Sequence, residues 1–138
     1  MPQSERRVGQ RFLIDTNILI YYLDGKMPPD VRDFTAQVLA TSFVISVITK
    51  IEFLGWPRFS DGDHVSARKF LEEAEVLSLT ADIVEETIRL KRSESIKLPD
   101  AVIAATCLLQ NFTLLTRNQS DFQSITDLKV HNPFSVTG

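Results

Sequence analysis

Short apolar runs alternate with stretches of helical periodicity along most of this chain, and no other feature constrains its fold more. Residues 43–46 read Phe-Val-Ile-Ser, a run that favours a strand, whereas residues 99–110 begin with Pro and then repeat small apolar residues at helical spacing. Strands that alternate with helices are typical of an α/β domain with a mainly parallel sheet. We therefore expect one α/β domain, with a central sheet of four to five strands flanked by helices.

The bounds of these elements follow from apolar periodicity, from helix caps and from breaking residues. The expected strands are residues 11–14, 43–46, 76–79 and 112–115, with a short last strand at Val130. The expected helices are residues 16–23, 28–39, 47–54, 64–74, 81–93 and 99–110. In the helix at 81–93, we expect the core-facing side chains to be Ile83, Val84, Thr87 and Ile88.

Composition limits the kinds of protein that this chain can be. Its 138 residues suit one domain, which we place at residues 11–138 after a polar tail at residues 1–10. The net charge of −3 argues against a broad basic surface for DNA, and the single cysteine, Cys107, leaves no partner for an internal disulfide. No apolar run is long enough to cross a membrane. We expect a cytoplasmic protein without membrane contacts.

Four acidic residues fall near the places where a parallel sheet gathers its ligands, beyond the carboxyl ends of strands. Asp15 directly follows the first expected strand, and Asp121 follows the strand that ends near Thr116. Asp100 lies at the start of the Pro-started helix, and Glu52 lies among apolar residues in the helix after the second strand. Taken one at a time, each acid has an ordinary explanation as a helix cap, a first-turn charge or part of a solvated face.

Together, the four acids indicate a metal site. Carboxylates that converge at one edge of a sheet repel one another and raise one another's pKa values. A divalent cation reverses this cost, because carboxylate oxygens suit Mg²⁺ and Mn²⁺ and the cation stabilises their ionised forms. We therefore interpret the four acids as ligands for Mg²⁺ or Mn²⁺.

Three segments of the chain resemble a known family. They read FLIDTNILIYYL from residue 12, TKIEFLG from residue 49 and KLPDAVIAATCLLQNFTLLTRNQSDF from residue 97. In these segments and their spacing, from about Arg11 to Pro133, the chain is similar to PIN domains of the VapC toxin type. The resemblance implies a parallel sheet flanked by helices, an acidic pocket and a Mg²⁺- or Mn²⁺-dependent endoribonuclease in which metal-activated water hydrolyses RNA phosphodiester bonds.

The same resemblance assigns roles to residues. It makes Asp15, Glu52 and Asp100 catalytic metal ligands. Many family members place the fourth acid at the position of Asn118, and others place it at the position of Asp121, which we choose here. The supporting residues, expected to orient carboxylates or water, are Thr16, Asn17, Thr116 and Asn118. Capping and turn formation explain these supporting residues equally well.

Binding of RNA also requires positive charge beside the acids. The basic residues between positions 89 and 97 are opposed within that stretch only by Glu94. The candidate phosphate contacts are Arg89, Lys91, Arg92, Lys97 and Arg117. A solvated helix face explains any one of them equally well. The resemblance further implies a small antitoxin, as in type II toxin–antitoxin systems, and a homodimer.

Two other functions stay open on the sequence alone. The first is a non-catalytic PIN-like module that binds RNA or protein; the intact acids count against it, and the Asn at position 118 counts for it. The second is a phosphohydrolase or phospho-acceptor domain with Asp15 as nucleophile, but the second Asp that such chemistry needs is replaced by Asn17. No zinc motif of spaced histidines and no Gly-rich phosphate loop occurs in the sequence.

Overall fold

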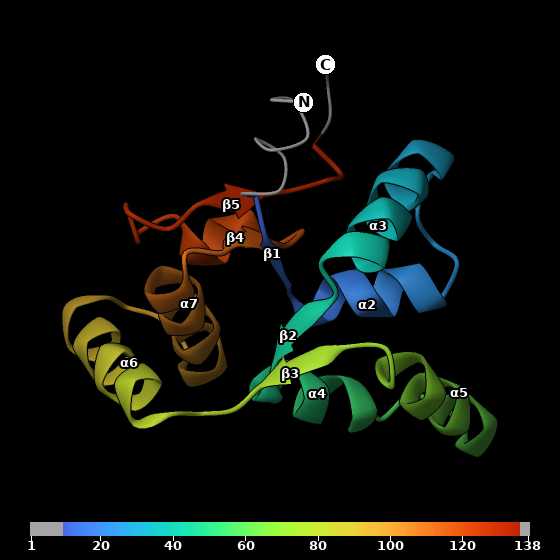
Figure 1. Ribbon diagram of the computed structural model, residues 1–138, viewed down its shortest axis with the longest axis horizontal. Coiled ribbons are helices and arrows are strands. Elements are labelled where there is room, and N and C mark those ends of the chain that lie inside the picture. Colours follow the sequence, from blue (N-terminus) through green and yellow to red (C-terminus); the bar gives the residue numbers. More distant parts are fainter. Residues whose placement is uncertain (1–9, 136–138) are drawn as a thin grey trace.

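The computed structural model describes residues 10–135, in which five short strands form one parallel sheet of order β3-β2-β1-β4-β5 (Figure 1). The strands are β1 (Phe12–Ile14), β2 (Val44–Ser46), β3 (Glu75–Leu77), β4 (Thr113–Leu115) and β5 (Val130–His131). The helices within the same residues are α2 (Thr16–Leu23), α3 (Pro29–Thr41), α4 (Val47–Leu54), α5 (Asp61–Leu71), α6 (Ala81–Ser93), α7 (Leu98–Gln110) and the 3-10 helix η1 (Gln119–Phe122). The expected α/β class is confirmed, while the expected tail at 1–10 lies, except for Gln10, outside the described residues.

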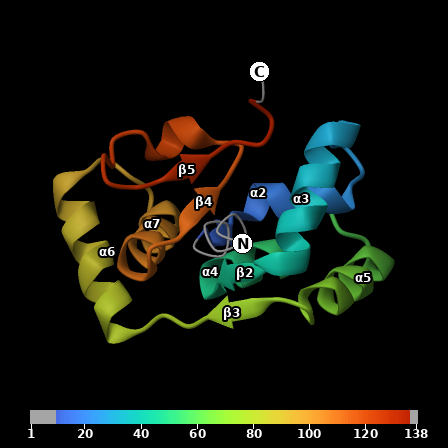
Figure 2. The same ribbon diagram turned by 45° about the horizontal axis from the view of Figure 1, so that its top comes forward.

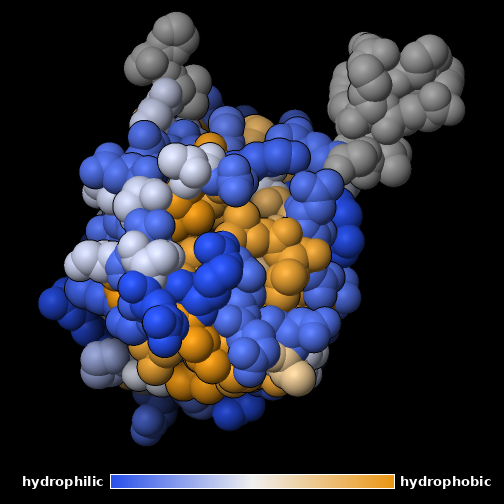
Figure 3. All heavy atoms as spheres, turned by 90° about the vertical axis from the view of Figure 1, so that its left-hand side faces the viewer, coloured by the Kyte–Doolittle hydropathy of each residue, from blue (hydrophilic) through white to orange (hydrophobic). Residues whose placement is uncertain are grey.

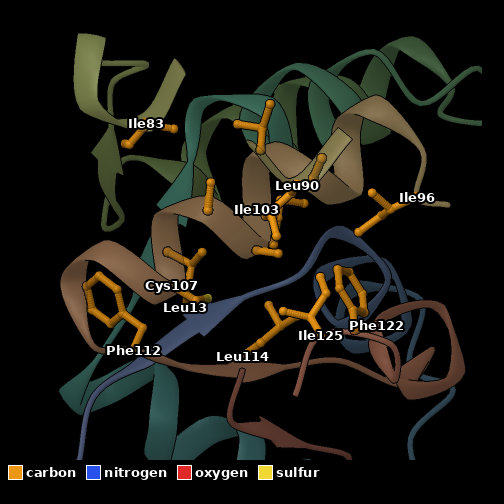
Figure 4. Close-up of a cluster of buried hydrophobic side chains, with 14 of the residues drawn as sticks. Leu13, Ile83, Leu90, Ile96, Ile103, Cys107, Phe112, Leu114, Phe122 and Ile125 are labelled. Carbon is orange, nitrogen blue, oxygen red and sulfur yellow. The ribbon is translucent and has the colours of Figure 1, made fainter. Parts of the chain in front are cut away.

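Consecutive residues of a strand point to opposite sides of the sheet, so each apolar strand contributes side chains to both faces. In β1, Leu13 belongs to a core formed with α6 and α7, whereas Phe12 and Ile14 belong to a second core formed with α2 to α5. The helices accordingly sort onto the two faces (Figure 2). Figure 4 shows the first core, in which Leu13 lies with Leu90 of α6 and Ile103 of α7.

The order of the strands reverses between β1 and β4. The chain builds β1, β2 and β3 outward to one side, and then returns to place β4 and β5 on the other side of β1. Ile14, the last residue of β1, is paired in register with Leu115, the last residue of β4. In open parallel sheets, ligand sites form outside the carboxyl ends of strands at such a reversal. The fold therefore favours a ligand site at the edge of the sheet beyond Ile14 and Leu115.

The expected start of the helix at residues 64–74 is wrong by three residues. The sequence pattern predicts a start at residue 64, whereas α5 begins at Asp61. The cause is a reciprocal cap: Oγ of Ser60 accepts from the backbone N of Asp63 at 3.0 Å, and Oδ2 of Asp63 accepts from the backbone N of Ser60 at 3.1 Å. This capping box satisfies backbone donors before the apolar periodicity begins, so the helix extends further toward its N-terminus.

The buried face of α6 also differs from the expectation. Ile83, Thr87 and Leu90 are buried, but Val84 and Ile88 are 37% and 46% exposed. The prediction that Val84 and Ile88 face the core is therefore wrong. Helix α6 packs chiefly against α7, and contact with a single helix buries a narrower stripe than the one predicted. Figure 3 shows the surface on this side of the molecule, where apolar patches are interrupted by polar residues.

Candidate functional site

Asp15 lies between β1 and α2, at the reversal of strand order, and is only 5% exposed. Its Oδ1 accepts from the backbone N of Thr16 at 2.8 Å. Its Oδ2 accepts from Oγ1 of Thr116 at 2.7 Å and from Nδ2 of Asn17 at 3.0 Å. Burial raises the pKa of Asp15, the charge of Glu52 raises it further, and these hydrogen bonds lower it. The carboxylate is thus held in one orientation on both of its oxygens.

Thr116 and Asn17 tie the end of β1 to the end of β4. While its hydroxyl donates to Asp15, Oγ1 of Thr116 accepts from Nδ2 of Asn17 at 3.2 Å and from the backbone N of Asn118 at 3.0 Å. Oδ1 of Asn17 accepts from the backbone N of Arg117 at 3.0 Å. All four supporting residues predicted from the sequence therefore lie in one hydrogen-bonded network around Asp15: Thr16, Asn17 and Thr116 donate to its carboxylate, and Asn118 joins through its backbone N.

Glu52 reaches this network from α4. Its Oε1 accepts from Oγ1 of Thr16 at 2.6 Å, and the same hydroxyl lies 3.3 Å from Oγ1 of Thr49. Thr16 thereby connects two acids, because its backbone N–H holds Asp15 and its side chain holds Glu52. Sequence analysis missed Thr49, although its spacing three residues before Glu52 places both on one face of α4.

Asp100 comes from the first turn of α7 and is partly buried. The pKa of Asp100 is raised to about 6, chiefly by burial and further by the negative charges of Asp15, Asp121 and Glu52. The positive charge of Lys97 opposes this rise. No hydrogen bond or ion pair within residues 10–135 holds the Asp100 side chain. The other three predicted acids therefore lie close enough to Asp100 for their charges to affect its pKa.

Asp121 enters this neighbourhood from η1, just beyond β4. Its backbone N donates to the carbonyl of Asn118 at 3.0 Å, and the next residue, Phe122, is 1% exposed in the core (Figure 4). The Asp121 side chain is exposed. Asn118 contributes its backbone N, rather than its side chain, to the network around Thr116. Of the two positions considered for the fourth acid, Asp121 is the one whose charge reaches Asp100.

The chemistry of these donors fits a divalent cation, although the spacing of the side chains is not that of a closed metal cluster. Among residues 10–135, no three acidic, histidine or cysteine side chains lie close enough together to form one. The four acids nevertheless offer only carboxylate oxygens, which Mg²⁺ and Mn²⁺ prefer, and no ion pair within these residues neutralises any of them. Carboxylates that repel one another favour wide spacing, and a shared cation removes that cost.

The basic residues of α6 that were predicted to contact RNA differ in their engagement. Arg89 forms an ion pair with Glu86. Nζ of Lys91 donates to the carbonyl of Ile96 at 2.6 Å. Arg92 is exposed, and no hydrogen bond or ion pair within residues 10–135 holds its side chain. Arg92 is therefore the most available of the three for an added phosphate.

The two remaining basic candidates lie nearer the acids. Lys97 directly precedes α7 and is close enough to lower the pKa of Asp100. Arg117 follows β4, and its guanidinium lies over the rings of Tyr21 and Phe134. Lys97 thus remains a candidate for contact with a phosphate, whereas the guanidinium of Arg117 already has partners within the protein.

A groove of about 1440 Å³ lies at the opposite ends of the strands. It is lined by α3 and by the residues at which β1, β2 and β3 begin, including Phe12, Val44 and Glu75. No predicted site residue lines this groove. This groove and the acidic site are therefore separate features of the molecule.

The comparisons with known proteins agree with this geometry. A family model described as PIN domain matches residues 12–128. A chain of a toxin–antitoxin complex from Klebsiella pneumoniae is 31% identical, with a TM-score of 0.72, over 90% of this chain and 98% of that one. A chain of VapBC-1 from nontypeable Haemophilus influenzae is 26% identical, with a TM-score of 0.72, over 91% of this chain and 100% of that one.

A further solved structure shows likeness of fold. It is the DNA-bound VapBC from Salmonella typhimurium, 21% identical with a TM-score of 0.76 over 90% of this chain and 98% of that chain. No curated protein matched the sequence. A family match across most of the chain and a fold shared with solved VapBC complexes confirm the resemblance seen in the sequence: this chain belongs to the PIN domain family.

Proposed function

We propose that this protein is a Mg²⁺- or Mn²⁺-dependent endoribonuclease and the toxin of a type II toxin–antitoxin system. The observation that carries the proposal is the network at the reversal of strand order, in which Thr16 bonds both Asp15 and Glu52. The charges of these two acids and of Asp121 also act on Asp100. The PIN family match supports nuclease chemistry. The structure from Klebsiella pneumoniae is a toxin–antitoxin complex, which supports a small antitoxin as the partner. The homodimer implied by the family resemblance stays a prediction.

In this proposal, the four acids supply the metal ligands. A divalent cation, when bound, supplies a more acidic water nucleophile and stabilises the negative charge that develops on the phosphate. The network around Thr16 and Thr116 orients Asp15 and Glu52 before any ligand arrives. If water, rather than the ribose 2′-hydroxyl, attacks the phosphorus and the 3′-oxygen leaves, the cleaved RNA should carry a 5′-phosphate and a 3′-hydroxyl.

The RNA backbone needs positive charge beside these acids. Lys97 is the nearest candidate, because it precedes the helix that carries Asp100 and acts on the pKa of that residue. Arg92 is exposed and unengaged within the described residues. We propose these two as the main phosphate contacts, and we rank Arg89 and Lys91 below them because both are already bound to other groups.

The proposed function is tested by RNA cleavage with mapped product ends, in the presence and absence of Mn²⁺. We expect Mn²⁺-dependent cleavage by the wild type. Asp15→Asn and Asp100→Asn should each lose more than about 100-fold, because even residues that only orient metal ligands are worth about 10- to 100-fold. Asp33→Asn, which changes an exposed acid on α3, is the matched control and should retain full activity.

Several outcomes would contradict the proposal. Products that end in a 2′,3′-cyclic phosphate would indicate a different mechanism, and full activity in Asp100→Asn would remove the acidic site from the reaction. Binding of RNA without cleavage at saturating Mn²⁺ would favour the non-catalytic module instead.

A further inference from the structure

Three kinds of contact hold Arg117, the residue that follows the buried threonine at the end of β4. Its backbone N donates to Oδ1 of Asn17 at 3.0 Å, and its carbonyl accepts from Nδ2 of Asn132 at 3.2 Å. Its guanidinium carbon lies 4.9 Å from the ring centre of Tyr21 and 4.4 Å from that of Phe134. A guanidinium at these distances is attracted to the faces of both rings.

The two rings form one platform beneath the guanidinium. Tyr21 and Phe134 contact each other edge to face, with ring centres 5.4 Å apart. The three groups therefore form a triangle, and Arg117 covers an aromatic pair instead of being sandwiched between two separate rings. The backbone N of Phe134 donates to Oδ1 of Asn132 at 2.9 Å, which folds the segment after β5 back toward Arg117. The cluster joins α2, the loop after β4 and the segment after β5.

This cluster is one of two anchors of the loop that carries Asp121. At the far end of the loop, Phe122 is buried in the core. At the near end, the backbone of Arg117 is bonded to Asn17, which also bonds Asp15. The 3-10 helix η1, of 4 residues, carries Asp121 and ends at Phe122, the far anchor itself. The place of the Asp121 carboxylate relative to Asp15 therefore depends on both anchors.

We propose that Arg117 is a positioning residue, which fixes the loop bearing Asp121 relative to Asp15 by stacking on Tyr21 and Phe134. The inference rests on the proposed metal-dependent function. It gives Arg117 a role different from the phosphate contact predicted from the sequence, because its guanidinium is engaged by the fold itself. A chain with the same acids but without this cluster would hold its fourth ligand less firmly.

The test compares Arg117→Ala and Phe134→Ala with the wild type. Phe134→Ala matters most, because it loosens the cluster but leaves the charge of Arg117 in place. We expect both variants to bind Mn²⁺ about tenfold more weakly in titration calorimetry, the low end of the effect of residues that orient metal ligands, because Arg117 acts on Asp121 only through the loop. Without metal, the backbone amides of Arg117 and Asn118 should exchange with solvent faster in both variants, as followed by NMR.

Arg32→Ala is the matched control. The guanidinium of Arg32 lies 4.2 Å from the ring centre of Tyr22 and donates to the Tyr22 carbonyl at 3.0 Å, but it contacts no residue of the loop after β4. This variant loses a comparable stacking contact at another place in the fold. Its Mn²⁺ affinity and the exchange of the Arg117 and Asn118 amides should match those of the wild type.

The outcomes separate this inference from the function on which it rests. Unchanged Mn²⁺ affinity in both test variants would overturn the positioning role, and so would a raised KM for RNA in Arg117→Ala alone, the result expected of a phosphate contact. If the wild type binds no Mn²⁺, the proposed function fails. The amide exchange rates, measured without metal, would then decide whether Arg117 holds the loop.

Discussion

The two halves of the acidic site are built in different ways. On the strand side, hydrogen bonds from Thr16, Asn17 and Thr116 hold the carboxylate of Asp15, and the Thr16 hydroxyl holds Glu52. On the helical side, no hydrogen bond or ion pair within residues 10–135 holds the carboxylate of Asp100 or Asp121. The first half is oriented in advance by its neighbours, whereas in the second half Asp100 is subject to burial and repulsion without hydrogen-bonded support.

The two halves differ in how far the protein itself stabilises the charged carboxylates. Hydrogen bonds to Asp15 already stabilise its charged form and oppose the effect of burial on its pKa. Asp100 has no such support, and its pKa rises to about 6. A shared cation would therefore relieve, at Asp100, repulsion that no hydrogen bond from the described residues offsets. The three predictions that follow probe this contrast, from the largest expected effect to the smallest.

Thr116→Val would disrupt the hydrogen-bonded network that holds Asp15. The change removes the hydroxyl that donates to Asp15 and leaves Nδ2 of Asn17 and the backbone N of Asn118 with one acceptor fewer. We expect the free energy of unfolding in urea to fall by about 2 kcal/mol or more, because the hydrogen bond reaches a buried carboxylate.

Thr106→Val is the control for this loss. The Thr106 hydroxyl is also buried, but it donates to the carbonyl of Val102 within its own helix. That carbonyl keeps its ordinary helical partner, so we expect a loss of less than about 1 kcal/mol. Equal losses of unfolding free energy in the two variants would show that the Thr116 hydroxyl contributes no more to stability than the hydroxyl of a buried threonine within a helix.

Asp100→Asn would relieve the helical half and should change its dependence on pH. The folded pKa of Asp100 is raised from 3.8 to about 6, so the stability from this carboxyl is present below the lower value and lost as the pH rises through the upper one. Without metal, the variant should be more stable than the wild type by about 1 kcal/mol at about pH 7, a figure reduced for partial exposure.

Urea unfolding at several pH values checks this prediction. The advantage of Asp100→Asn should shrink toward about pH 3, below the unfolded pKa of 3.8, where the wild-type carboxyl is largely protonated in both states. Added Mn²⁺ should stabilise the wild type more than the variant, because only the wild type keeps the carboxylate. An advantage that does not vary with pH would contradict the assignment of the effect to the charge of Asp100.

Lys97→Gln should give the smallest effect. It removes a positive charge that lowers the pKa of Asp100, so this pKa should rise further, as followed by NMR titration. If Lys97 contacts a phosphate of single-stranded RNA, the slope of log affinity against log salt should become shallower by about 0.7. Lys26→Gln, at an exposed position in the loop before α3, is the control and should change neither quantity. An unchanged salt slope in Lys97→Gln would remove this residue from the RNA interface.

Local sequence patterns predicted much of this molecule. The periodicity and caps of residues 16–23, 47–54 and 81–93 match α2, α4 and α6 at both ends. The position of Asp15 after an apolar strand predicted its place at the carboxyl edge of the sheet. These features depend on neighbours within one or two turns, so the order of residues carries them directly.

Other features could not be read from local pattern. The buried stripe of α6 depends on its angle against α7, and the sequence pattern alone wrongly turned Val84 and Ile88 inward. The stacking of Arg117 depends on a ring in α2 and a ring after β5, neither of which is a local neighbour of Arg117 in the sequence. In both cases, the local sequence pattern is compatible with several three-dimensional arrangements.

By itself, the sequence determined the elements, their order and the set of acids, because capping, periodicity and strand ends are local properties. The tertiary structure alone decided that Thr116 donates to Asp15, a residue 101 positions earlier, and that Arg117 lies on two rings. Both contacts follow from the return of β4 to the side of β1 opposite β2. That choice is made by packing across the whole sheet, and no spacing between residues encodes it.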